Sequence, residues 1–144
     1  MAQRDVADPV RYYQAHPQAI ADIAKREGID LVVLFGSAVR GRLRSESDVD
    51  IAVRFVGGRP GFEVEARVAA DLHDVLKPPR ELDLVVLNHV SPLLLVQVAD
   101  EGVPLYEAST EVWPQFWLYA RRRFEDTEKY RRRRWDALKQ RYLP

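Results

Sequence analysis

Two short segments with the composition of buried β-strands constrain this chain most strongly. Residues 49–55, VDIAVRF, alternate between two faces, and residues 31–35, LVVLF, form an apolar run rich in β-branched residues. Both patterns are typical of strands. Residues 62–76 carry apolar side chains at helical spacing, and residues 82–87, LDLVVL, follow as a further strand. A helix that lies between strands predicts an α/β fold.

The flanking regions add helices and one short strand. Residues 9–26 have a helical pattern that Pro17 is placed to break. Residues 92–100 are expected to form a short helix, and residues 103–106 a short strand or turn. An aromatic stripe at helical spacing then predicts a long C-terminal helix over about 110–142.

Length and composition fit one domain that spans residues 1–144. The chain has no cysteine, which excludes disulfides and thiolate zinc sites and fits a reducing compartment. No apolar run is long enough to span a bilayer, and the first residues lack the apolar core of a signal peptide. We therefore expect a soluble, cytoplasmic protein.

Charge is balanced overall but unevenly distributed. The sequence has 22 basic and 22 acidic residues, yet residues 121–144 contain ten Lys or Arg and only four Asp or Glu. The tail therefore carries a net charge of +6 and the remainder −6. The run of arginines at 131–134 would fan around a helix axis, which favours a solvated or partner-facing helix over a nucleic-acid-binding one.

Two carboxylates open the alternating strand. Asp48 and Asp50 are two residues apart, so their side chains project from the same face of a strand while Val49 and Ile51 point into the core. A bridging cation stabilises such a pair, and hard carboxylate oxygens favour Mg²⁺ or Mn²⁺. The alternative is that both are turn residues at the strand entrance, where Asp is common.

Gly36 and Ser37 directly follow the preceding strand. The next residues, 38–43, can begin a short helix whose free N–H groups suit a phosphate. Glycine lets a phosphate approach the backbone, and Ser37 adds a hydroxyl group. Arg40, one turn further on, is the preferred additional phosphate ligand, although an arginine-rich surface loop is usually only solvated.

A third carboxylate, Asp83, lies in the apolar strand at 82–87. Buried beside Val85 and Leu87, an unpaired Asp83 would cost several kcal/mol, so we expect it to have a partner. Next to Asp48 and Asp50 it would complete a cluster able to hold two cations, the arrangement used for in-line phosphoryl transfer. Glu81 is the competing candidate, but its position at the edge of the strand suggests solvent.

These motifs resemble the nucleotidyltransferase superfamily typified by DNA polymerase β. Within it, SDVDIAV at 47–53 looks most like the minimal MNT nucleotidyltransferases, the antitoxin halves of HEPN/MNT toxin-antitoxin pairs. The resemblance covers residues 31–87, and EGVPLYE at 101–107 is also similar. It implies a small mixed sheet with helices mainly on one face and a single nucleotidyltransferase domain, with its core at about 28–108.

The resemblance also implies residue roles. Gly36 and Ser37 would hold the triphosphate of ATP, and Asp48 and Asp50 would bind two Mg²⁺ or Mn²⁺ ions. Asp83 would complete the metal site and help deprotonate the attacking hydroxyl group. The implied reaction is transfer of AMP from ATP to a hydroxyl group of a HEPN toxin, with a tyrosine as the acceptor.

Two other functions stay open on these residues. One is modification of a small molecule, such as an aminoglycoside, and the other is a nucleotide-binding module that neutralises a partner by occlusion. Neither a Walker-type loop nor a dinucleotide-binding fingerprint occurs, and the three histidines show no metal-ligand spacing. Only the tail follows the expected core, so an acceptor site would be shallow or completed by another subunit, in a homo- or hetero-oligomer. This favours a protein acceptor.

The aromatic stripe of the tail exceeds what one helix needs to seal so small a domain. We expect the part up to about Phe124 to pack on the core. The part beyond it, flanked by arginines, is predicted to dock a partner, because Trp, Tyr and Arg dominate interface hot spots. The alternative is that the whole helix folds back onto its own domain.

Overall fold

The computed structural model describes residues 9–36, 39, 48–79 and 81–143. Its four-stranded sheet has the order β3-β2-β1-β4, and the strands are β1 (Ile29–Phe35), β2 (Val49–Phe55), β3 (Leu82–Val86) and β4 (Val103–Glu107). β1 pairs antiparallel with β2 and β4, whereas β2 and β3 are parallel. The sheet is therefore mixed, as expected.

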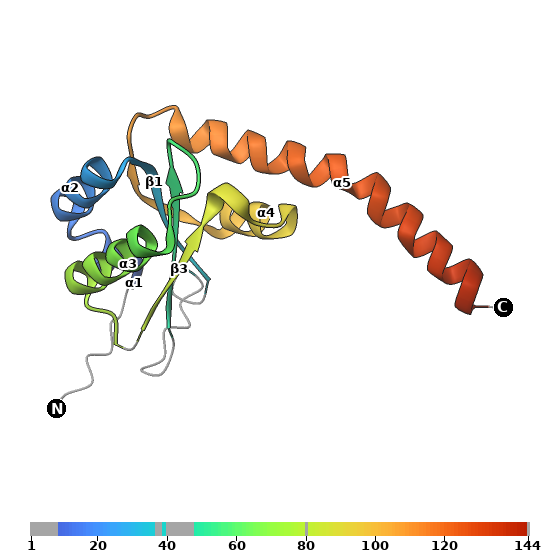
Figure 1. Ribbon diagram of the computed structural model, residues 1–144, viewed down its shortest axis with the longest axis horizontal. Helices are drawn as coiled ribbons and strands as arrows, with labels where there is room; N and C mark the ends of the chain where they lie inside the picture. Colours follow the sequence, from blue (N-terminus) through green and yellow to red (C-terminus); the bar gives the residue numbers. More distant parts are fainter. Residues whose placement is uncertain (1–8, 37–38, 40–47, 80, 144) are drawn as a thin grey trace.

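In the described part of the chain, helical segments surround this sheet (Figure 1). The predicted N-terminal helix is broken at Pro17, because proline is tolerated in a first helical turn but not in a helix interior. The crossover between the two parallel strands is α3, over the residues predicted for it. The segments are α1 (Pro9–Tyr13), α2 (Pro17–Glu27), α3 (Phe62–Leu76), η2 (Leu87–His89), α4 (Pro92–Glu101) and α5 (Val112–Tyr142).

Helices cover both faces of the sheet, so the expectation of helices mainly on one face is wrong. The physical reason is that the central strands are apolar on both sides. On β1, Val32 and Leu34 pack with α2 and α3, while Leu31 and Val33 pack with α4 and α5. A strand that is buried on both faces needs a helical layer on each.

The β2 strand shows why its polar residues gather on one side. Val49, Ile51, Val53 and Phe55 are buried in the core formed with α2 and α3. Ala52, on the opposite face, belongs to the second core, which is formed with α4 and α5. By the two-residue period of a strand, Asp48 and Asp50 project from the face that α4 and α5 partly cover.

The long helix α5 begins over the sheet and continues well beyond it (Figure 1). Its first turns contribute the buried Val112, Phe116 and Ala120. The Glu107 side chain accepts a hydrogen bond from the Trp113 backbone N–H at 3.1 Å, which satisfies one of the free donors at the helix start. From residue 128 to residue 143 every side chain is exposed. The alternative in which the whole helix folds onto its own domain is therefore wrong.

Among the described residues, no helix combines the length and apolar character needed to cross a membrane.

Candidate active site

The candidate active site lies where β1 ends and where β2 and β3 begin. Asp50 pairs in register with Phe35 of β1 on one side and with Asp83 of β3 on the other. Because β2 and β3 are parallel, these two acidic residues lie side by side at the same end of the sheet. Asp48 comes two residues earlier in the chain and is half-buried, like Asp50.

The carboxylates of Asp50 and Asp83 share one face of the sheet. Val85, two residues after Asp83, packs against the core formed with α4 and α5, and so does Ala52, two residues after Asp50. Neighbouring like charges on adjacent strands are destabilising unless something offsets them. The arrangement is therefore typical of a site that receives a cation or another positively charged group.

Asp83 is exposed to solvent, contrary to the expectation of a buried carboxylate that demands a partner. The expectation assumed that Val85 and Leu87 surround it, but both lie further along the chain, under the helical layer. Asp83 stands at the open beginning of β3 instead. A solvent-exposed carboxylate costs little to keep charged and is accessible to a large substrate.

Gly36 closes the site on the β1 side. Its φ of 76° lies in the left-handed region that favours glycine. A Cβ atom at this position would overlap Oδ2 of Asp50 and lie 3.1 Å from its Cγ. The Asp50 carboxylate thus rests directly against the Gly36 backbone, in space that a side chain would fill.

The other phosphate-binding candidates, Ser37 and Arg40, lie outside the described residues, as does the expected helix at 38–43 apart from Val39. Among the residues that the structure does describe, no three acidic or histidine side chains gather closely enough to hold a metal ion. The oxygen donors of Asp48, Asp50 and Asp83 are nevertheless the type that Mg²⁺ and Mn²⁺ prefer, and two of them share a register position. Their chemistry fits such an ion.

Several polar interactions that fix the sheet were not apparent from the sequence. Asp30 and Arg54 form a two-pronged ion pair, with N–O distances of 2.8 and 3.0 Å, beside the register shift between Ile29 and Leu31. Arg54 also stacks 6.0 Å from the Phe116 ring centroid, which ties β2 to α5. These contacts join residues far apart in the chain, and no local pattern signals them.

Asn88 also joins two segments that are far apart in the sequence. Its side chain accepts a hydrogen bond from the Phe55 N–H at 3.0 Å and donates one to the Phe55 carbonyl oxygen at 2.8 Å. Beyond the end of β3, the Asn88 side-chain amide therefore hydrogen-bonds to the β2 backbone as a neighbouring strand would. The contact holds β2 and β3 in the register that places Asp50 beside Asp83.

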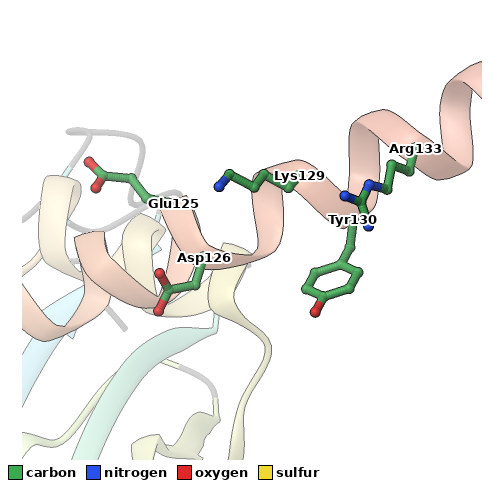
Figure 2. A pocket seen from close by; sticks show the side chains of 5 residues that line it. All are labelled: Glu125, Asp126, Lys129, Tyr130 and Arg133. Carbon is green, nitrogen blue, oxygen red and sulfur yellow. The ribbon is translucent and has the colours of Figure 1, made fainter.

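Two surface grooves lie on α5, away from the carboxylates. One is lined by Glu125, Asp126, Lys129, Tyr130 and Arg133, and Figure 2 shows these side chains projecting from the helix. The other is lined by Phe124, Glu128, Arg131, Arg132 and Trp135. Because one helix supplies every lining residue of both, neither groove encloses a small molecule.

The fold and the carboxylate end of the sheet define a nucleotidyltransferase. The family model for polymerase beta, nucleotidyltransferase, matches residues 18–111, and the chain belongs to this family. A candidate protein adenylyltransferase of Methanocaldococcus jannaschii is 31% identical over 84 residues, which cover 58% of this chain and 87% of that protein. The predicted superfamily is therefore confirmed.

Solved structures agree on the fold. A chain from a toxin-antitoxin complex with AMP-PNP superposes with a TM-score of 0.70 at 23% identity and covers 85% of this chain and 98% of its own. A chain from the complex of a tri-AMPylated Shewanella oneidensis HEPN toxin with its MNT antitoxin gives a TM-score of 0.66 at 22% identity, covering 88% and 98%. A candidate minimal nucleotidyltransferase gives 0.56 at 32% identity, covering 66% and 94%. The expected polymerase-β type of mixed sheet, with its long C-terminal helix, is confirmed.

Proposed function

We propose that this chain is a metal-dependent protein adenylyltransferase, which transfers AMP from ATP to a tyrosine hydroxyl group of a HEPN-type toxin and so acts as its antitoxin. The observation that carries this proposal is the pairing of Asp50 with Asp83 at the sheet end closed by Gly36. The names of the relatives support the choice of acceptor, because one is described as a protein adenylyltransferase and another contains an AMPylated HEPN toxin.

Each residue has a role in this proposal. The carboxylates of Asp48, Asp50 and Asp83 would hold Mg²⁺ or Mn²⁺. The bound ion would neutralise negative charge on the triphosphate. Gly36 leaves the backbone open to the phosphates and gives the Asp50 carboxylate its space. Ser37 and Arg40 would contact the triphosphate, as the family resemblance implies.

The reaction is an in-line displacement at the α-phosphorus of ATP. A bond forms between the acceptor oxygen and the α-phosphorus, and the bond from that phosphorus to the bridging oxygen breaks. Pyrophosphate leaves with the electron pair. Asp83 accepts the proton of the attacking hydroxyl group, and its exposure leaves it within reach of a hydroxyl group on another protein.

The test first looks for the gene of a HEPN-type protein beside the gene of this chain, and then combines that protein with the full chain, ATP and Mg²⁺. Intact-mass measurement should show the partner gaining mass in AMP-sized steps, and peptide mass spectrometry should locate the modification on tyrosine. The Asp83→Asn variant serves as the inactive control. A partner that is neutralised without any gain in mass would contradict transfer and favour occlusion. Modification of an aminoglycoside but not of the protein would favour a small-molecule acceptor.

A further inference from the structure

The part of α5 that extends beyond the domain is exposed to solvent along its whole length. We call residues 128–143 the α5 extension; all of them are exposed. It is helical up to Tyr142, so at 1.5 Å per residue it reaches about 22 Å beyond the packed turns. Figure 1 shows it projecting past α4 into solvent. An isolated helix of this length is marginal in water, so a partner would stabilise it.

The face of α5 that packs on the domain continues along the extension. Phe116 and Ala120 are buried, and Phe124, four residues on, is half-buried. Helical spacing places three apolar side chains of the extension on the same face. They are Trp135, Leu138 and Tyr142, which are 58%, 42% and 69% exposed. We call these three residues the extension stripe.

An arginine packs against the aromatic ring of Phe124 at the beginning of this face. Arg131 lies 4.0 Å from the centroid of the Phe124 ring and donates a hydrogen bond to the Phe124 carbonyl oxygen at 3.2 Å. Arg131 also lines the groove that contains Phe124 and Trp135. The face thus combines aromatic and arginine side chains, the residue types enriched at the centre of protein interfaces.

The charge of the α5 extension restricts what can cover the stripe. The extension contains seven basic and two acidic residues, a net charge of +5. Two extensions packed against each other would bring these like charges together, which is unfavourable. The stripe is also shorter than the three to four heptads that a stable coiled coil needs. A protein surface with an apolar centre and acidic surroundings would cover the stripe and complement the positive charge of the extension.

We propose that the α5 extension is the docking surface for the acceptor protein of the transfer reaction, and that it binds an apolar patch rimmed by carboxylates. This inference rests on the proposed function and deepens it by assigning the surface that recognises the substrate. α5 packs on the face of the sheet from which Asp50 and Asp83 project. A small folded domain is about 30 Å across, so one held by the extension lies on the side where AMP is transferred.

The experiment compares two variants of the full chain that alter exposed aromatic residues of one helix. Trp135→Ala/Tyr142→Ala removes two members of the extension stripe. Tyr130→Ala is the matched control, because Tyr130 is 71% exposed but lies on a different face of α5. Calorimetry measures the affinity of each for the HEPN-type protein sought in the test of the proposed function, and for ATP with Mg²⁺. Steady-state kinetics measures transfer as a function of partner concentration.

For the double variant we expect a loss of partner affinity of at least about tenfold and a matching rise in KM, with kcat and ATP affinity unchanged. Tyr130→Ala should behave as the wild type. Equal partner affinity in all three proteins would overturn the docking role, even if AMP transfer occurs. Transfer that fails in a wild-type complex whose affinity depends on the stripe would overturn the proposed function and leave the docking role standing.

Three further outcomes would overturn the docking role. In the first, sedimentation of the chain alone shows self-association that depends on Trp135. This outcome would assign the stripe to a second copy of this chain. Stripe-dependent binding of a duplex RNA probe, without protein capture, would assign it to nucleic acid. A wild-type chain that neither binds nor modifies the HEPN-type protein would overturn both the docking role and the proposed function.

Discussion

Gly36 and Asp50 are packed so closely that a Cβ atom at position 36 would overlap the Asp50 carboxylate. Gly36 follows the strand residue Phe35, which pairs in register with Asp50, so the close approach is built into the pairing of β1 and β2. Two physical requirements therefore converge on one glycine. The backbone needs a positive φ, and the neighbouring carboxylate needs the space of the missing side chain.

Gly36→Ala should abolish function with a modest loss of stability. An alanine at a φ of 76° is strained by about 1–2 kcal/mol, and its methyl group would push the Asp50 carboxylate aside. A catalytic group displaced by about 1 Å can lower the rate by about 100-fold. We expect a loss of AMP transfer of at least this size, measured alongside the melting temperature.

Gly28→Ala is the matched control for this substitution. Gly28 has a similar φ of 71°, but nothing lies within 4 Å of a Cβ atom built there. It should lose a similar amount of stability and keep full transfer activity. If both variants keep their activity, the contact between Gly36 and Asp50 has no part in the chemistry.

Asp83→Asn should abolish AMP transfer while leaving the fold intact. Because Asp83 is exposed, we expect the free energy of unfolding to change by no more than about 0.5 kcal/mol. Asp48→Asn and Asp50→Asn should also remove transfer and relieve repulsion between the carboxylates. Glu81→Gln, an exposed change just before β3, should stay active. A large drop in melting temperature for the three aspartate variants would instead assign these residues a structural role.

ATP should bind weakly when divalent cations are removed. The carboxylates of Asp48, Asp50 and Asp83 would repel the triphosphate unless a cation offsets their charge. Calorimetric titration with Mg²⁺ should therefore give an affinity at least about tenfold higher than titration in chelator. In Asp50→Asn this difference should shrink. Equal ATP affinity with and without metal in the wild type is the result that contradicts a metal-dependent site.

Acid should weaken the contact between α2 and α3. Hydrogen bonds from Arg67, at 2.8 Å to both carboxylate oxygens of Glu27, together with a weaker one from Arg26, lower the pKa of Glu27 from 4.5 to about 2. The unfolded chain binds this proton more readily, so the stabilisation is complete above pH 4.5 and is lost as the pH falls towards 2.

Glu27→Gln should therefore be less stable than the wild type by about 1 kcal/mol near pH 7, a value limited by the exposure of Arg67. The difference should narrow as the pH falls below about 4, as measured by urea unfolding at a series of pH values. A difference that stays constant over this range would mean that the Glu27 carboxylate does not carry the effect.

Local patterns predicted most of the fold. The alternation at 49–55 and the helical spacing at 62–76 gave the bounds of β2 and α3, because both patterns reflect periodic burial of one face. The prediction of helices mainly on one face did not take into account that β1 is apolar on both faces. A continuous apolar run such as LVVLF requires a helical layer on each side of the sheet, and helices mainly on one face would leave it exposed.

The carboxylate site was only partly predictable. The i, i+2 spacing of Asp48 and Asp50 predicts a shared face, but the pairing of Asp50 with Asp83 depends on the register between strands that α3 separates in the chain. The exposure of Asp83 depends on where the helical layer ends, which no local pattern encodes. The same holds for Asn88, whose side chain pairs with the distant Phe55 backbone.

Removal of the chain after Thr127 should spare the domain. Every residue from 128 to 143 is exposed, so the free energy of unfolding should change by no more than about 0.5 kcal/mol and the melting temperature by about 2 °C. Metal-dependent ATP binding should be unchanged, whereas capture of the HEPN-type partner should weaken. Truncation after Gln115 is the contrasting control, because it also removes the buried Phe116 and Ala120. It should cost at least about 3–5 kcal/mol, the cost of truncating one buried phenylalanine side chain. An unfolded product of the first truncation would show that the α5 extension stabilises its own domain, and undiminished partner capture by it would remove the docking role.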